Sequence, residues 1–130
     1  MQKIISLIGI GAIVIAQPVS ACEAHARQVA YRSQCNTIAS YYGHGDIYHG
    51  QRTASGEILN GYGLSAAHRT LPFGTSLKVT NIENGKSVLV KVNDRGPYVA
   101  SRSLDLSYGA FIKIEDPRRG LAKVCVSEVA

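Results

Sequence analysis

The sequence predicts an all-β fold, a small barrel that carries one short helix. Short runs of alternating or apolar residues are separated by turn signals, a pattern typical of barrels built from short strands. Thirteen glycines among 130 residues indicate a turn-rich chain rather than a helical bundle. A chain of 130 residues suits one domain and leaves no room for a second sizeable core.

Each element of the predicted barrel rests on a local pattern. The Asn84-Gly85 pair between two apolar runs is a strong hairpin signal, and Ser107 can cap a helical turn that continues to Ile112. Six glycines between Gly43 and Gly63 predict a long loop, and loops of such length in compact domains usually serve function. Strands are expected at Thr37–Tyr42, Ser76–Asn81, Ser87–Asn93, Ser103–Leu106 and Ala122–Glu128.

Residues 1–21 are predicted to be a signal peptide rather than part of the fold. Lys3 precedes the uncharged run Ile4–Ala16, which would rise only about 20 Å as a helix, short of a bilayer core of roughly 30 Å. Pro18 and small residues then follow, as at a secretory cleavage site. The polar residues 22–37 are predicted to form a tether, and residues 38–130 the barrel domain.

The end of the signal peptide offers two cleavage routes. Val19-Ser20-Ala21-Cys22 resembles a bacterial lipobox, in which the cysteine is lipidated and becomes the new N-terminus. Ordinary signal-peptidase cleavage after Ala21 or Ala26 is the alternative. Lipidation of Cys22 would hang the domain from a membrane, and Glu23 favours the outer membrane over the inner one. Either route predicts a periplasmic location.

Cysteine usage agrees with export. Without Cys22 the chain keeps Cys35 and Cys125, an even pair in an oxidising compartment. A bridge between them would tie the two ends of the domain together, and two unpaired thiols are the alternative. A metal site is not expected, because the one His or Cys pair with short ligand spacing is His44 and His49 on a glycine-rich loop.

The chain is basic, with 14 Lys and Arg against nine Asp and Glu. A net charge of +5 suits a polyanionic neighbour such as nucleic acid, a membrane surface or an anionic cell wall. Export and the lack of a dense basic run argue against nucleic acid as the partner.

Three polar segments stand out, because an ordinary barrel would not need them. They are Tyr48–Glu57, Ser65–Thr75, and Val92–Tyr98 followed by Arg102–Ser107. Within and around them stand the motifs Ala39-Ser40-Tyr41-Tyr42-Gly43, Arg52-Thr53-Ala54-Ser55-Gly56-Glu57, Ala66-Ala67-His68-Arg69-Thr70-Leu71-Pro72-Phe73-Gly74-Thr75 and Asn93-Asp94-Arg95-Gly96-Pro97. In this order and spacing the motifs resemble the RlpA family of bacterial cell-wall proteins, the rare lipoprotein A type of lytic transglycosylase. The likeness runs from about Ala39 to Val126.

The resemblance implies a double-psi β-barrel, in which about six strands close into a barrel of the kind also seen in expansins. It implies cleavage of peptidoglycan glycan strands between N-acetylmuramic acid and N-acetylglucosamine, by a monomer with no metal or organic cofactor. Two features depart from the family pattern. Tyr41-Tyr42 stands where Trp-Tyr is usual, and the chain ends at Ala130 without the C-terminal peptidoglycan-binding repeat domain that many relatives carry.

Within that family pattern Asp94 matches the residue taken as catalytic, and Glu57 and His68 match the residues that accompany it. Cleavage of a glycosidic bond needs a proton for the departing oxygen, which a carboxylic acid can supply. A lytic transglycosylase adds no water, because the 6-hydroxyl of the muramic acid closes onto the anomeric carbon. One carboxyl group can therefore act first as acid and then as base. From the residues alone, Asp94 could also be a turn residue, Glu57 a solvated loop residue and His68 a semi-buried histidine. Asp105 is interpreted as a support for the helix start at Ser107.

Aromatic and basic side chains supply candidate substrate contacts. Sugars pack their C–H faces on aromatic rings, and arginines can bind the lactyl or stem-peptide carboxylates of the wall. The candidates are Tyr41, Tyr42, Tyr48, Tyr98, Arg69 and Arg95, with Arg52 and Arg102 as further cations. Packing within the barrel is the alternative for each tyrosine. The alternative to an enzyme is a non-catalytic peptidoglycan-binding or wall-loosening module in the manner of expansins.

Overall fold

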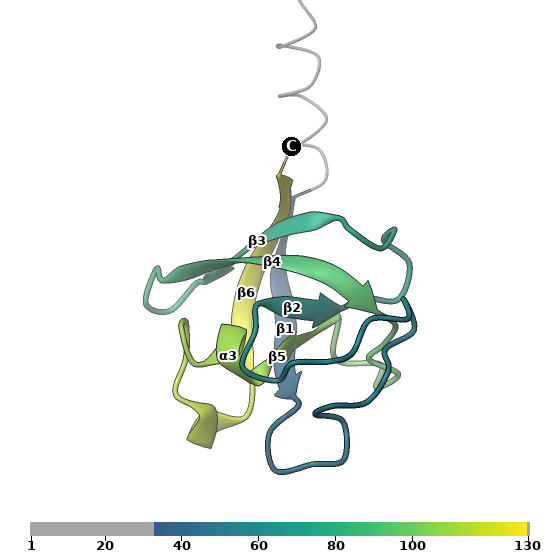
Figure 1. Ribbon diagram of the computed structural model, residues 1–130. Coiled ribbons are helices and arrows are strands. Elements are labelled where there is room, and N and C mark those ends of the chain that lie inside the picture. The colour runs from purple at the N-terminus through teal and green to yellow at the C-terminus, as the bar shows by residue number, and fades with distance from the viewer. Residues whose placement is uncertain (1–32, 130) are drawn as a thin grey trace, which may run out of the picture.

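The computed structural model describes residues 33–129, which fold into a closed barrel of six strands (Figure 1). The hydrogen-bonded order around the barrel is β1-β5-β2-β4-β3-β6. The strands are β1 (Gln34–Tyr42), β2 (Ser65–Ala67), β3 (Ser76–Asn81), β4 (Ser87–Asp94), β5 (Leu104–Ser107) and β6 (Ala122–Val129). A short helix, α3 (Tyr108–Phe111), and a 3-10 turn (Pro117–Arg119) lie between β5 and β6. For the described part of the chain, the prediction of a six-stranded all-β barrel with one short helix is confirmed.

The strands pair in a mixed pattern. β3 pairs antiparallel with β4 and with β6, and the β3–β4 hairpin confirms the signal at Asn84-Gly85. β1 pairs parallel with β5, and β2 pairs parallel with β4. The sequence does not predict β2, because three residues are too few to show an alternating pattern. This strand exists through its pairing on both sides, with β4 and with β5.

β1 begins earlier than the pattern predicts. Its first residue is Gln34 rather than Thr37, so the barrel begins inside the range assigned to the tether. Gln34 pairs with Val126 of β6, and a register irregularity separates this pair from Thr37; within it Asn36 adopts a positive φ of 61°. Asparagine tolerates this left-handed conformation better than most residues do, and the local break hides the start of the strand from an alternating pattern.

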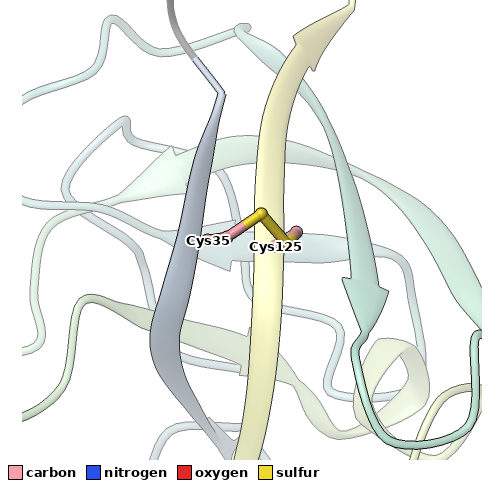
Figure 2. The surroundings of a disulfide bond; sticks show 2 residues. All are labelled: Cys35 and Cys125. Carbon is pink, nitrogen blue, oxygen red and sulfur yellow. A yellow bond between two sulfur atoms is a disulfide. The ribbon is translucent and has the colours of Figure 1, made fainter.

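A disulfide joins Cys35 of β1 to Cys125 of β6, which confirms the predicted pairing (Figure 2). The bridge crosses between neighbouring antiparallel strands, which lie side by side in both views. It links positions 90 residues apart, so it ties the first strand to the last and restricts the unfolded chain.

The apolar core combines alternate residues of the strands with the inner face of α3. In β3, for example, Leu77 and Val79 are buried while their neighbours are more exposed, as in a half-buried strand. Phe111 of α3 is fully buried. Ser107 begins the helix by accepting a hydrogen bond from the Ala110 N–H, which confirms the predicted cap.

The long loop between β1 and β2 is closed at its base. Gly43 and Gly61 lie so close that a Cβ on Gly61 would stand 1.9 Å from the Gly43 carbonyl oxygen. Further along, the Gly50 N–H donates to the Leu59 carbonyl at 2.9 Å and holds the two arms together. Residues 44–50 at the tip are all exposed. The loop projects beyond the arrowhead of β1 in Figure 1.

The signal peptide, the lipidation of Cys22 and both cleavage sites concern residues 1–32, and so they lie outside the described residues. Among residues 33–129, no helix is long and apolar enough to cross a membrane.

Candidate active site

Strand β2 brings two carboxylates into one row across the sheet. β2 lies between β4 and β5, and its Ala67 is the register partner of Asp94 on one side and of Asp105 on the other. The β2–β4 register shifts between Ala66 and Ala67, so that Asn93 is an extra, bulged residue of β4. Bulges commonly re-aim side chains next to active sites, and this one sets Asp94 opposite Ala67.

Hydrogen bonds fix the Asp94 carboxyl group. Its Oδ1 accepts hydrogen bonds from the backbone N–H groups of Ala54 (3.0 Å) and Arg95 (2.9 Å). Its Oδ2 accepts a hydrogen bond from the Tyr42 hydroxyl at 2.9 Å. Because two backbone amides occupy Oδ1, Oδ2 is the oxygen that can exchange a proton with a substrate.

The Arg52–Glu57 motif acts on Asp94 through its backbone. The Ser55 N–H donates to the Asn93 carbonyl at 3.2 Å, so the motif docks on the bulge that carries Asp94. The Thr53 N–H donates to the Glu57 carbonyl at 2.7 Å and closes the turn. The Glu57 carboxylate itself is exposed and is not among the groups that line the cleft around Asp94.

Asp94 lies in an open cleft of about 510 Å³. Residues from β1, β2, β4, β5 and the loops around them form its surface, so the cleft joins segments far apart in the sequence. Its lining consists of Tyr41, Tyr42, Asp46, Tyr48, Arg52, Ala67, Asp94, Arg95, Gly96, Pro97, Tyr98, Arg102 and Asp105. Five of the six predicted contact residues are therefore brought together with Asp94, and Arg69 is not.

Tyr42 lies among carboxylates. Burial raises the pKa of the Tyr42 hydroxyl well above its usual value, and the charge of Asp94 and the hydrogen bond to it raise this pKa further, with smaller effects from Asp105 and Asp46. The phenol therefore keeps its proton at physiological pH and remains a donor to Asp94. The Tyr42 ring also packs edge-on against Tyr48, with ring centroids 5.8 Å apart.

The other tyrosines of the cleft differ in exposure. Tyr98 is 84% exposed and Tyr48 is 51% exposed, so both rings are open to a sugar face. Tyr41 packs its ring against Phe111, with centroids 4.8 Å apart, and donates from its hydroxyl to the Pro117 carbonyl at 3.1 Å. Tyr41 is thus anchored to the core, and only part of it reaches the cleft.

His68 lines a cavity other than this cleft. The cavity measures about 270 Å³ and is also lined by residues of β1, β3 and β6. The His68 Nδ1 accepts hydrogen bonds from the N–H groups of Thr70 and Leu71, both at 3.1 Å. Burial lowers the pKa of His68, and the charges of Arg95 and Arg69 lower it further. The ring is therefore a neutral acceptor that shapes the turn after β2.

Arg69 is occupied within the protein. Its Nε donates to the Pro97 carbonyl at 2.6 Å, and its Nη2 donates to the carbonyls of Val99 (2.8 Å) and Arg102. The guanidinium thus fixes the loop that carries Tyr98 into the wall of the cleft.

Arg95 and Asp46 also shape the cleft. The Arg95 guanidinium lies over the Phe73 ring, 3.9 Å from its centroid, and Arg95 lines the cleft as predicted. Asp46, which sequence reasoning misses, accepts hydrogen bonds from the N–H groups of Gly43 (2.8 Å) and Tyr48 (2.9 Å). A signal for Asp46 was its place in the glycine-rich loop, where aspartate often caps turns.

Asp105 is the residue whose interpretation changes most. It lines the cleft with Asp94, and its contacts within residues 33–129 are with Ser40 and Arg102 rather than with the helix start at Ser107. Its place in a polar segment already singled out was the available signal, but only the closure of the barrel brings that segment to Asp94.

The cleft offers acid–base and hydrogen-bonding groups. Among residues 33–129, no three His, Cys, Asp or Glu side chains are grouped closely enough to hold a metal ion. The carboxyl, phenol and guanidinium groups in the cleft suit proton transfer and the recognition of hydroxyl and carboxylate groups.

Solved structures share the fold. A papain inhibitor from Streptomyces matches with a TM-score of 0.59 over 75% of this chain and 94% of its own, at 23% identity. A mutant expansin from Clavibacter michiganensis, in complex with cellohexaose, matches with a TM-score of 0.60 over 75% of this chain and 50% of its own, at 21% identity. At these identities the likeness shows the fold alone, and the predicted double-psi β-barrel is confirmed.

Other relatives are much closer in sequence. A probable endolytic peptidoglycan transglycosylase RlpA from Synechocystis sp. is 53% identical over 92 residues, which are 71% of this chain and 28% of the relative. The endolytic peptidoglycan transglycosylase RlpA of Pseudomonas aeruginosa is 48% identical over 91 residues (70% and 26%), and that of Campylobacter jejuni is 49% identical over 96 residues (74% and 34%). The matched part thus spans about a quarter to a third of each relative.

The family match covers nearly the whole barrel. Residues 34–126 match the family described as lytic transglycolase. This range contains all the motifs of the cleft, from Tyr42 on β1 to Asp105 on β5. The chain therefore belongs to the RlpA family.

Proposed function

We propose that this protein is an endolytic lytic transglycosylase, which cleaves peptidoglycan between N-acetylmuramic acid and N-acetylglucosamine and leaves a 1,6-anhydro product. The observation that carries the proposal is the Asp94 carboxyl group, with Oδ1 held by two backbone amides and Oδ2 in an open cleft. Relatives named for this activity, at about half identity across the barrel, support it.

In the proposed reaction Asp94 acts first as acid and then as base. Its Oδ2 gives a proton to the glycosidic oxygen, and the bond from that oxygen to the anomeric carbon breaks, with the electron pair leaving on the oxygen. The 6-hydroxyl oxygen of the muramyl residue forms a bond to the anomeric carbon, and its proton returns to Oδ2. The carboxyl group ends as it began, so no water, metal or second acid is consumed.

Tyr42 supports both halves of this cycle. Its hydroxyl donates to Oδ2 when Asp94 is ionised, and it can rotate to accept when Asp94 is protonated. Because its pKa is raised, Tyr42 does not compete for the proton. The exposed rings of Tyr48 and Tyr98, which line the same cleft, would pack on sugar faces.

The two residues predicted to accompany Asp94 hold the backbone around the cleft in this proposal. The Glu57 carbonyl closes the turn that presents the Ala54 N–H to Asp94. The neutral His68 ring shapes the turn that carries Arg69, and the Arg69 guanidinium fixes the loop that carries Tyr98 into the cleft wall. Both residues therefore position the cleft rather than transfer protons.

The test is product analysis by mass spectrometry after digestion of purified peptidoglycan. We expect muropeptides or glycan fragments that end in 1,6-anhydro-muramic acid, which are 18 mass units lighter than hydrolysis products because no water is added. Digestion of the same peptidoglycan with a hydrolytic muramidase is the matched control. Reducing-end muramic acid as the product of this protein would contradict the transglycosylase reaction.

The second candidate is a non-catalytic peptidoglycan-binding or wall-loosening module. The exposed tyrosines of the cleft and the expansin fold, found with a bound cellohexaose, favour it. The Asp94→Asn variant separates the two, because the amide keeps the shape of the carboxyl group and cannot donate a proton as an acid. Lost cleavage with retained sacculus binding supports the enzyme, whereas unchanged activity in cells supports the module.

The proposed location is the periplasm, with a lipid anchor on Cys22 at the outer membrane. The lipobox pattern at residues 19–22 supports it. Because β1 begins at Gln34, roughly 12 residues precede the barrel from Cys22 on, and when extended they would reach at most about 40 Å, enough to meet nearby glycan. Intact mass of the protein from its native envelope is the test. A species that starts at Arg27 without lipid mass would contradict the anchor.

A further inference from the structure

Asp105 belongs to the same row of side chains as Asp94. Ala67 of β2 is the register partner of both, and Ser40 of β1 is the next partner of Asp105. Register partners on adjacent strands point to the same face of a sheet, about 4.8 Å apart. The row Asp94–Ala67–Asp105–Ser40 therefore places two carboxylates on one face, roughly 10 Å apart at their Cα atoms and separated by a single methyl group.

The row lies in the cleft of the candidate active site. Asp94, Ala67 and Asp105 all line the same cleft. Tyr42 is two residues after Ser40 on β1, so its side chain lies on the same face, and its hydroxyl reaches Asp94. A substrate that presents its glycosidic oxygen to Asp94 thus has its sugar ring above Ala67, within reach of Asp105.

The Asp105 side chain is held in place by two polar neighbours. Its Oδ1 accepts a hydrogen bond from the Ser40 hydroxyl, and the Arg102 Nε lies 4.0 Å from the same oxygen. Its side chain is only 18% exposed, so the carboxylate is ordered before a substrate arrives. This hydrogen bond and this ion pair both involve Oδ1, and Asp105 lines the cleft.

We propose that Asp105 is a second catalytic carboxylate, which stabilises the positive charge that develops on the muramyl ring as the glycosidic bond breaks. Asp105 gives and takes no proton in this step, since Asp94 supplies the proton to the leaving oxygen and recovers it from the 6-hydroxyl. The gain arises because a fixed negative charge in a partly enclosed cleft interacts with the transition state and not with the neutral ground state. This inference rests on the proposed function, and it adds a division of labour between two carboxylates.

A purely structural interpretation predicts something different. If Asp105 served only to tie β5 to β1, its hydrogen bond with Ser40 would be its contribution, and its charge would not matter. Asp105→Asn keeps an acceptor oxygen for Ser40 and removes the charge. Ser40→Ala removes the hydrogen bond and keeps the charge.

The experiment compares these two variants with the wild-type protein and with Glu83→Gln, which removes a carboxylate outside the cleft. We expect Asp105→Asn to lower kcat for release of 1,6-anhydro products by about 10²-fold or more, with sacculus binding unchanged. Ser40→Ala should lose less than about fivefold, and Glu83→Gln should match the wild type. Turnover of Asp105→Asn within about threefold of the wild type, or an equal loss in Ser40→Ala, would overturn the proposal.

A binding measurement separates this inference from the proposed function. Calorimetry is run with a protonated iminosugar, a cationic six-membered ring that carries an N-acetyl group, and with its neutral ring-oxygen counterpart. We expect Asp105→Asn to weaken binding of the cation by about tenfold and to leave the neutral sugar unaffected. Equal binding of the cation by the variant and the wild type would overturn the role of Asp105. If the wild-type protein releases no anhydro product, the proposed function fails, and this titration still decides whether Asp105 recognises a cationic ring.

Discussion

The two sides of the barrel are built in different ways. On the side that we call regular, β3 pairs with β6 at six positions and with β4 at five, and the Cys35–Cys125 disulfide links β6 to β1. On the other side, the short strand β2 joins β4 and β5 through three and two positions and a bulge. The regular side stabilises the fold, and the irregular side carries the cleft.

The difference follows from what each side must do. Regular antiparallel pairing satisfies the backbone groups and buries alternate side chains, which leaves few polar groups to aim at a ligand. A bulge and the loops around it re-aim side chains out of that alternation, at some loss of pairing. Substitutions on the two sides should therefore separate activity from stability.

The largest expected effect is on the irregular side. Asp94→Asn should lower cleavage by about 10³-fold or more, because the proton donor is lost while both backbone amides keep an acceptor oxygen. The thermal midpoint should stay within about 2 °C of the wild type. Turnover assays and thermal melts, with Glu83→Gln as the control, check both statements. A large drop in the thermal midpoint would show that the cleft side also determines the stability of the fold.

The largest effect on stability should come from the regular side. Replacement of Cys35 and Cys125 by serine should lower the free energy of unfolding by about 2–5 kcal/mol, because the unfolded chain gains freedom. Denaturant unfolding measures this change, and reduction of the wild-type protein should reproduce it. Cleavage per folded molecule should not change, since neither cysteine lines the cleft. A tenfold loss of activity at a temperature where the variant is folded would show that the disulfide also shapes the cleft.

His68 lies between the two sides of the barrel, because it follows β2 and lines a cavity with residues of β1, β3 and β6. His68→Asn places an acceptor oxygen where Nδ1 accepts from Thr70 and Leu71, so activity should stay within about threefold of the wild type. His68→Leu removes the acceptor and should cost about 1–2 kcal/mol of stability and part of the activity. A loss of 10²-fold or more in His68→Asn would instead show that the imidazole transfers protons.

The smallest expected effect is a pH dependence of stability. The pKa of His68 is lowered from its usual 6.5, so below about pH 6.5 the unfolded chain binds a proton that the folded chain does not. Stability should therefore fall as the pH decreases from about 6.5 towards the lower pKa of the folded state. Unfolding measured at several pH values checks this slope, and His68→Asn should flatten it. A slope that is the same in the variant would assign the effect to other groups.

Much of the regular side could be predicted from the sequence. The alternation of β3, the Asn-Gly turn and the Ser107 cap are local signals, and local signals fix local structure. The start of β1 was hidden by a single residue, Asn36, whose left-handed backbone interrupts the pattern. β2 gave no signal at all, because its existence depends on strands that the chain reaches later.

The cleft was predictable in its residue types and less so in its geometry. The resemblance of the motifs to a family singled out Asp94, and the structure places it with Tyr42, Tyr48 and Tyr98. The separation of His68 from the cleft could not be foreseen, because a motif gives the order of residues and not the direction of each side chain. The partnership of Asp94 and Asp105 depends on barrel closure for the same reason.

The pinched base of the loop after β1 has a consequence for how such proteins can diversify. Because Gly43 and Gly61 touch at the neck, the stretch between them begins and ends at almost one point in space. Its length and composition at the exposed tip, residues 44–50, can change without moving the strands on either side, provided that the contacts of Asp46 with Gly43 and of His49 with Gly61 are kept. The tip of this loop can therefore be replaced as a unit. Grafting tips from relatives would alter which glycans the cleft admits while the barrel below stays the same.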